Sequence, residues 1–548
     1  MSTCTRAVQV GDITKGFIRE NPGLFIWYLV FLAVVPLTDV GIPHMVGRVI
    51  KNLNSKRQLY FNFIIIVVFI ALGQIGHTIS DTIDVYMLPN MVDYVRNLIV
   101  KHILDVQSTQ YSELKGGEIS TKLIKLPVTY YGFAEQIKNL WIPEFIILLV
   151  SVIYLIRVDP PLGYTCLVLT IAIIIYSFKT ITFCEMISRK RDASFNATVE
   201  ETDDILRNSI SVINANQQEQ ELQRLKDKHK IYDKMSKETF QCGLRPRYVY
   251  LPIIILLFTV YMVYSYQKIK DNTLKIASFV VILLIVVQVV TSMFKILGSI
   301  KDTVFKWGML QYSMEIFNKC QVEKFQNLRE NVPKEGIFVD NITYQYKSED
   351  GTREVFKDFS LYIKPNKCTI VEGKIGSGKS TLIKLLNKYH LPDNGSIFIN
   401  GMPYTALSPQ DLHRIIGYVP QTPTLFNRSI YDNITYGIEP KPSESEVENW
   451  LKSLSVYELV DELPKGLQTN AGKNGSNISG GQRQIVWFLR IILQNTPYII
   501  LDEPTSAMDG KTKMYIYKLI EKLKKDKTIV VVSHDTKIRN YADEVIRL

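Results

Sequence analysis

A glycine-rich segment over residues 373–381 has the composition and spacing of a phosphate-binding loop. It fits the pattern G-x-x-x-x-G-K-S between a predicted strand at 368–372 and a predicted helix that begins near Thr381. Glycines let the backbone wrap around an anion, and the start of the helix adds a partial positive charge. We expect Lys379 to reach the β- and γ-phosphates of ATP and the Ser380 hydroxyl to coordinate Mg²⁺. The residues expected to bind the nucleotide here are Gly373, Lys374, Ile375, Gly376, Ser377, Gly378, Lys379, Ser380 and Thr381.

Two adjacent carboxylates end a second apolar strand, predicted over residues 498–501. An acid at the end of a buried parallel strand is placed to hold Mg²⁺, which assigns that role to Asp502. Glu503 lies one residue further, where it can direct a water at the γ-phosphate. The alternative is an ordinary strand that ends in two acidic residues by chance. The phosphate loop alone does not show whether the chain is a kinase, a GTPase or a transport ATPase.

A second helix start with phosphate-binding character lies at Asn477-Ile478-Ser479-Gly480-Gly481-Gln482-Arg483-Gln484. A serine and two glycines that lead into a helix make an anion-ready N-terminus. One ATP does not need two such sites on one domain, so the second is expected to serve a neighbour's nucleotide. With this segment the chain resembles the ATPases of the ABC transporter family, whose signature sequence it matches with Ile478 in place of the usual leucine.

The resemblance extends over about 210 residues and implies an α/β P-loop ABC ATP-binding domain at 325–548. It includes the ordered segments Gly417–Gln421, Leu425–Phe426, Asp432–Ile434, Ser506–Asp509 and Val531–His534. Two departures stand out. Lys473 occupies a place where exporters usually carry a glutamate, which puts coupling between the domains in doubt, and Pro504 replaces the usual alanine while leaving both carboxylates intact.

The family pattern also implies roles for residues outside the phosphate loop. Tyr346 would stack on adenine, with a strand aromatic of the core as the alternative. Gln421 would contact Mg²⁺ and the lytic water, and His534 would hold the γ-phosphate and position Glu503. Asp509 would act across a dimer interface. The signature residues expected to bind the opposite subunit's nucleotide are Ser479, Gly480, Gly481 and Gln482.

Six stretches before residue 300 are apolar and long enough to cross a bilayer as helices. They lie at 24–46, 60–80, 142–158, 162–182, 250–267 and 276–297. The fold class expected is therefore a multi-domain membrane protein with an all-α six-helix transmembrane domain over 1–320, and this domain resembles the exporter type. The long charged connections at 81–141 and 183–249 indicate that helices two to five extend beyond the bilayer on one side.

The orientation follows from the domain order. The sixth span runs into a domain that needs ATP, so the long loops and both termini are expected in the cytosol. Residues 1–21 read as an amphipathic lead-in rather than a cleavable signal, and no address indicates which membrane. The resemblance places one coupling helix near Tyr111 and Gly117–Ile119 and another at Leu206–Glu221, with generic amphipathic loop helices as the alternative.

Four ionisable residues lie near the predicted span ends: Lys179, Lys295, Glu144 and His77. Positions at the membrane interface are expected for them, with a substrate or proton role as the alternative. The six cysteines show neither paired nor metal-ligand spacing, which favours a reducing compartment. The net charge of +11 fits cytosolic loops beside anionic lipid, and no nucleic-acid-reading module is evident, so no nucleic-acid partner is expected.

One phosphate loop and one signature make half of a two-ATP assembly, so a second chain is required. A homodimer is favoured over a heterodimer because both hydrolytic and signature residues are intact. The function predicted is an ATP-hydrolysing exporter half-transporter for a hydrophobic or amphipathic substrate. An ATP-gated regulator or channel is the alternative. The cargo, whether small molecule, lipid or peptide, is not readable from the sequence.

Overall fold

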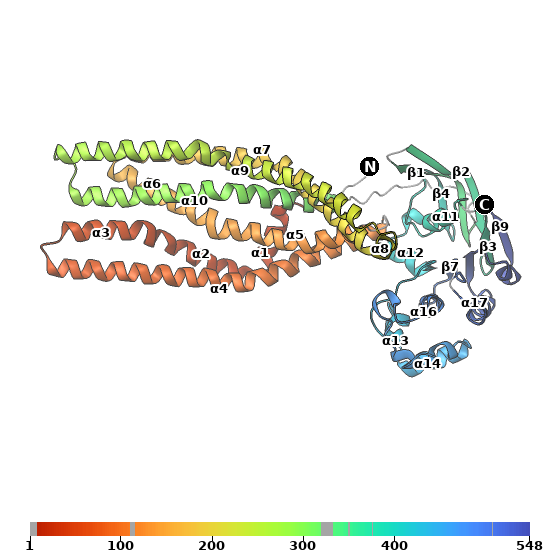
Figure 1. Ribbon diagram of the computed structural model, residues 1–548. Coiled ribbons are helices and arrows are strands. Elements are labelled where there is room, and N and C mark those ends of the chain that lie inside the picture. Colours follow the sequence, from red (N-terminus) through yellow and green to blue (C-terminus); the bar gives the residue numbers. More distant parts are fainter. Residues whose placement is uncertain (1–7, 110–115, 319–332, 349–350, 375, 507) are drawn as a thin grey trace. The chain divides into compact units, whose positions relative to one another are not determined.

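The computed structural model describes residues 8–109, 116–318, 333–348, 351–374, 376–506 and 508–548 (Figure 1). Two compact units emerge, and each is described by itself. The helical unit contains Arg6–Ile103 and Glu113–Cys320, and the α/β unit contains Gln321–Leu548.

All six predicted spans are helices that are apolar and long enough to cross a membrane, so this prediction is confirmed. The candidate spans are Pro22–Lys51, Lys56–Asp105, Lys122–Val158, Pro160–Arg207, Gln218–Lys270 and Ile276–Phe317. A bilayer needs about 20 helical residues, whereas the last five spans have 37 to 53. The expected extension of helices two to five is therefore present, and the sixth helix extends as well. The underlying helices are α2 (Pro22–Pro36), α3 (Ile42–Lys51), α4 (Lys56–Thr109), α5 (Gly116–Gln136), α6 (Ile142–Val158), α7 (Pro160–Arg207), α9 (Gln218–Lys270) and α10 (Ile276–Met314).

The last span, α10, lies at the centre of the helical unit and packs against α5, α6, α7 and α9. Its inner side chains, among them Ile285 and Ile300, are fully buried. Backbones approach closely at Gly308, where a Cβ atom would lie 2.1 Å from the Ser188 hydroxyl oxygen of α7. At the N-terminus, α1 (Val10–Glu20) buries only Ile13 and Phe17, which confirms the amphipathic lead-in.

Two spans contain a short π-helix, η1 (Leu37–Gly41) and η2 (Ile137–Trp141). Each is followed directly by an isoleucine and then a proline, Pro43 or Pro143. A proline has no N–H, and its ring clashes with the carbonyl group four residues earlier. The wider π turn moves that carbonyl away, which explains why both helices widen just before the proline.

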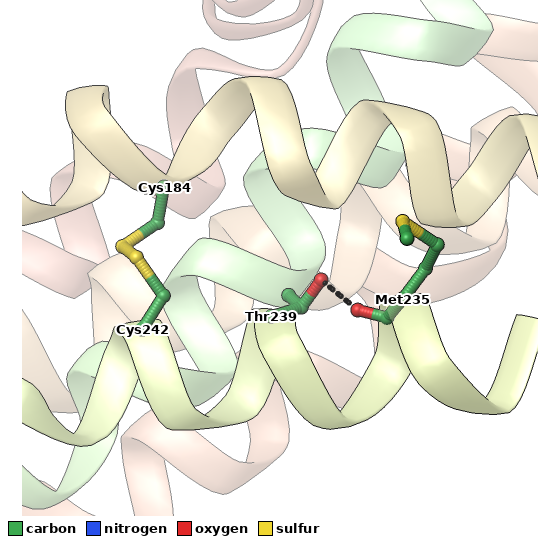
Figure 2. Close-up of a disulfide and its surroundings, with 4 residues drawn as sticks. All are labelled: Cys184, Met235, Thr239 and Cys242. Atoms are coloured by element: carbon green, nitrogen blue, oxygen red, sulfur yellow. Dashed lines mark hydrogen bonds between the residues drawn. A yellow bond between two sulfur atoms is a disulfide. The ribbon is translucent and has the colours of Figure 1, made fainter.

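The hairpin of α7 and α9 carries a disulfide between Cys184 and Cys242, whose Cα atoms are 5.9 Å apart (Figure 2). The short helix α8 (Ser209–Asn214) lies at the turn between the two long helices (Figure 1). The prediction of unpaired cysteines was wrong for this pair, and the inference of a reducing compartment loses that support. Sequence spacing failed because antiparallel helix packing, not proximity in the chain, brings the two sulfur atoms together.

The α/β unit contains a five-stranded parallel sheet in the order β6-β7-β8-β3-β9 and an antiparallel sheet in the order β2-β1-β4-β5. The central strands β7 and β8 are buried at every residue, which explains their unbroken apolar sequences. The expected α/β class is confirmed. The strands are β1 (Ile337–Ser348), β2 (Gly351–Ile363), β3 (Cys368–Glu372), β4 (Asn394–Ile399), β5 (Met402–Pro403), β6 (Ile416–Val419), β7 (Tyr498–Asp502), β8 (Thr528–Val532) and β9 (Glu544–Arg547). The helices used below are α11 (Lys379–Leu386), α16 (Gly480–Leu493) and α17 (Gly510–Leu523).

Candidate nucleotide-binding site

The parallel sheet gathers the predicted catalytic residues at one edge. Strands β3, β6, β7 and β8 end next to one another, and parallel strands present their carboxyl ends together. A cavity of about 530 Å³ lies at this edge. Among the residues that line it are the predicted Tyr346, Gly376, Gly378, Lys379, Ser380, Thr381, Gln421, Asp502, Glu503 and His534.

The phosphate loop is held by left-handed glycines and by its own lysine. Gly376 and Gly378 have φ angles of +84° and +100°, which side-chain-bearing residues rarely adopt. The Lys379 ammonium group donates hydrogen bonds to the carbonyl oxygens of Gly373 and Lys374, at 2.8 and 3.0 Å. These bonds hold the lysine against the loop at the start of α11. Ile375 lies outside the described residues.

Asp502 is a buried acid with 9% of its surface exposed. Burial, together with the neighbouring Glu503 carboxylate, raises the pKa of Asp502 to about 6. The Tyr418 hydroxyl donates to its Oδ2 atom over 3.4 Å. Ser380 and Gln421 add oxygen atoms to the same cavity. Mg²⁺ prefers oxygen ligands, and a buried carboxylate favours a nearby cation, so these residues fit the ion.

Glu503 adopts a left-handed backbone conformation, with φ at 48°. Its N–H donates to the Val532 carbonyl oxygen over 2.8 Å, which ties it to the end of β8. The His534 backbone N–H donates to Glu503 Oε2 over 3.3 Å, and His534 Nε2 lies 3.6 Å from Glu503 Oε1. The predicted base and the predicted histidine are therefore in direct contact.

The signature residues do not line this cavity. Ser479 caps α16, accepting the Gln482 N–H over 3.1 Å while the Gln482 side chain accepts the Ser479 N–H over 2.9 Å. Asp509 caps α17 by accepting the Thr512 N–H over 2.7 Å. Gly480 and Gly481 form the first turn of α16. A second phosphate-ready helix start thus stands apart from the first.

Comparison with known proteins identifies the family. The profile of the ABC transporter transmembrane region matches residues 25–293, and the profile described as ABC transporter matches residues 356–506. The chain belongs to the ABC transporter family. A membrane region followed by an ATP-binding region in one chain is the arrangement of an exporter half-transporter, and the ABC protein is a multi-pass membrane protein.

Curated relatives and a solved structure agree with this assignment. The ATP-dependent lipid A-core flippase of Alkalilimnicola ehrlichii is 35% identical over 213 residues, which cover 39% of this chain and 36% of the flippase. The match thus spans about a third of that relative's length. The human ABC-type oligopeptide transporter ABCB9 is 23% identical over 94% of this chain and 68% of its own. A bacterial Atm1-family ABC exporter with ATP bound shares the fold, with a TM-score of 0.81 and 19% identity over 97% of this chain and 93% of its own.

Sequence reasoning missed a buried glutamine that joins two motifs of the ABC domain. The Gln484 side-chain amide, on α16, donates to the backbone oxygens of Gln421 (3.0 Å) and Glu503 (3.2 Å). Gln484 is 1% exposed. It closes the signature motif in sequence, but only the fold reveals its two partners.

Two further residues of the ABC domain were missed. Arg353 lines the cavity and pairs with Tyr346 across the β1–β2 hairpin. Asp535 fixes the segment that carries His534. Its Oδ2 atom accepts hydrogen bonds from Tyr517 Oη, Thr505 Oγ1 and Lys513 Nζ.

Proposed function

We propose that this chain is an ATP-hydrolysing half-transporter that works as a dimer and moves a hydrophobic or amphipathic substrate across a membrane. The observation that carries the proposal is the separation of the two phosphate-ready helix starts. The cavity at α11 contains Lys379, Asp502 and Glu503, whereas α16 presents Ser479 away from it. Two ATP molecules between two antiparallel α/β units would complete both sites.

Each residue of the proposed site has its own role in ATP binding and hydrolysis. Lys379 and the glycine N–H groups bind the phosphates, while Ser380 and Asp502 hold the metal. Mg²⁺, when bound, neutralises charge on the phosphates. Glu503 orients and deprotonates the attacking water, and His534, 3.6 Å away, holds the Glu503 carboxylate in place. Tyr346 provides a face for adenine, and Ser479 of the other chain donates to the γ-phosphate.

The extended hairpin supports a coupling role for α8. Two of its apolar side chains, Ile210 and Ile213, are 75% and 58% exposed. A short helix with exposed apolar side chains is suited to pack on another surface. We assign to α8 the transmission of ATP-driven motion, with the long helices and the α/β unit in the cytosol. The first expected coupling segment includes Tyr111, which lies outside the described residues.

The test is ATP hydrolysis by the purified chain alone in lipid nanodiscs. Mg²⁺-dependent activity is expected, and Glu503→Gln should lower it by at least about 100-fold because the water loses its base. Glu521→Gln, at a surface ion pair on α17, is the matched control and should leave it unchanged. Silence of the wild type despite ATP binding would contradict a self-sufficient homodimer and favour a different partner chain.

Transport is tested in sealed vesicles that contain the same protein. ATP-dependent accumulation of an amphipathic tracer on one side, absent in Glu503→Gln, is expected for a pump. ATP-dependent equilibration of a tracer down its gradient, without accumulation, would instead support a gated channel.

A further inference from the structure

An ion pair lies inside the candidate membrane spans. The Lys295 ammonium group of α10 is 2.6 Å from Oε1 of Glu144 on α6. Position at the membrane interface was expected for both, yet the Glu144 residue is only 5% exposed. At 1.5 Å per residue, Glu144 lies about 20 Å and Lys295 about 28 Å from the span ends at the short connections. Both distances fall within a hydrocarbon core of about 30 Å.

A second carboxylate belongs to the same cluster. Asp39 interacts electrostatically with Lys295, Glu144 and His77. The cluster thus contains two carboxylates and one lysine beside a histidine. Carboxylates therefore outnumber the lysine by one in this cluster. A charge inside a membrane span is costly unless something neutralises it.

One oxygen of the cluster has no partner among the described residues. Glu144 Oε2 is fully buried and accepts no hydrogen bond, although Oε1 is bound to Lys295. A buried acceptor without a donor costs free energy, and a charged one costs more. The Lys295 side chain is 49% exposed, so the cluster is open on one side. A group that brings positive charge to this opening would offset the excess negative charge of the cluster.

Asp39 and Glu144 each lie in or directly after a π-helix. Asp39 lies within η1, and Glu144 lies in the first helical turn after η2. Such π segments are frequent at functional sites, because the extra residue per turn redirects the following side chains. Both occur before a proline, on two spans that meet α10.

We propose that Asp39, Glu144 and Lys295 form a binding site for the cationic group of an amphiphile, such as a substituted ammonium or phosphonium ion with apolar substituents. The proposal rests on the proposed transport function and deepens it by naming the chemical class of the cargo. A monovalent cation at the exposed side of the cluster offsets the excess negative charge of the two carboxylates. An anion would meet two carboxylates and a lysine that is already paired.

The test compares two ions of similar shape and opposite charge, tetraphenylphosphonium and tetraphenylborate. Equilibrium binding of radiolabelled tetraphenylphosphonium is measured in protein-loaded nanodiscs without nucleotide, and binding to empty nanodiscs is subtracted. Saturable binding of about one ion per site is expected, with no competition from tetraphenylborate. Because no nucleotide is present, the result does not depend on ATP hydrolysis, so failure of this site and failure of the pump are distinguishable.

Three variants should change the affinity for tetraphenylphosphonium, two of them lowering it and one raising it. Glu144→Gln and Asp39→Asn should each weaken tetraphenylphosphonium binding by about tenfold or more, because each removes one negative charge in a poorly solvated region. Lys295→Met should tighten binding by about tenfold, because the competing internal cation is gone. The ion pair between α6 and α10 is made by Glu144 and Lys295, so Asp39→Asn tests the site while that helix contact stays in place.

Matched controls are available on the exposed surface of two other spans. Asp81→Asn on α4 and Lys179→Met on α7 change the same charges at exposed positions and should leave binding unchanged. Absence of saturable binding, equal competition by tetraphenylborate, or wild-type affinity in both Glu144→Gln and Asp39→Asn would overturn the proposal. Weaker binding in Lys295→Met would also overturn it, because the site would then recognise an anion.

Discussion

The N-termini of α11 and α16 are made from similar residues but lie in different surroundings. At α11, glycines in left-handed conformations open the loop, and Lys379, Asp502 and Glu503 surround the cavity. At α16, Ser479 caps the helix and the side chain is exposed. The N-terminus of α11 has the proposed metal ligand Asp502 and the proposed base Glu503 beside it, whereas Ser479 at α16 does not line that cavity. We therefore expect phosphate binding and phosphate chemistry to be separable in this fold.

The strongest test of that comparison is a mixture of two inactive proteins. Lys379→Ala removes the phosphate-binding lysine, and Ser479→Asp keeps a helix cap but repels the γ-phosphate. Each alone should lose at least about 100-fold in hydrolysis rate. Random mixing should restore about a quarter of the wild-type sites, because half of the dimers gain one intact site. Single-turnover hydrolysis in dissociated and remixed samples measures this.

Ser479→Asn is the control, because it caps the helix without a charge and should retain most activity. Activity in Ser479→Asp alone, or a mixture as inactive as its components, would contradict sites shared between chains.

A methyl group at Gly378 should impair nucleotide binding at the N-terminus of α11 and leave the N-terminus of α16 unaffected. A Cβ atom there would lie 2.8 Å from Val355 Cγ1 and 2.9 Å from Phe356 Cζ, at a φ angle of +100°. We expect Gly378→Ala to weaken ATP binding by roughly 30-fold, because strain and the clash act together. Titration with a fluorescent ATP analogue measures it. Gly510→Ala, where nothing lies within 4 Å, should bind as wild type.

Gln484 on α16 contacts the backbone of two residues that line the cavity at α11. Gln484→Leu therefore tests whether that cavity depends on α16. Leucine removes both donors, to Gln421 O and Glu503 O. We expect kcat to fall by about tenfold with little change in ATP affinity, because Glu503 loses its position rather than its charge. Steady-state hydrolysis gives both values. Gln494→Leu, at the far end of α16, should be neutral, and an equal fall there would point to general damage to the helix.

The smallest effect is expected at Asp535. Burial alone would raise the pKa of Asp535, but hydrogen bonds from Tyr517, the Lys537 N–H and Lys513 lower it to about 2. A lowered carboxyl pKa stabilises the fold above the unfolded value near 4, by roughly 1–3 kcal/mol. Asp535→Asn should therefore lower Tm at pH 7, and the difference should vanish as the pH falls from about 4 to about 2. Asp526→Asn, in an exposed turn, is the control. A constant difference down to pH 2 would exclude this origin.

How much of the structure can be predicted from the sequence differs between the two units, for a physical reason. The phosphate loop and the Asp502-Glu503 pair lie in strand–loop–helix segments, where local order fixes function, and the structure brings them together as expected. The side-chain partners of Gln484 and Asp535 lie 18 to 63 residues away, which a local pattern does not reveal. In the helical unit, each helix reads as apolar in sequence, but pairing Glu144 with Lys295 requires the packing of α6 on α10.

The disulfide in the α7–α9 hairpin has a mechanical consequence. Cys184 and Cys242 are each 29 residues from Ile213, near the end of α8. The bond resists sliding of α7 past α9. The hairpin between the bond and the helix ends at Arg207 and Gln218 is therefore a stiff lever about 35 Å long. A tilt of about 5° at the bond would move the tip by roughly 3 Å over that length. If α8 transmits ATP-driven motion as proposed, this stiffness converts its movement into rotation of the bundle instead of shear between neighbouring helices.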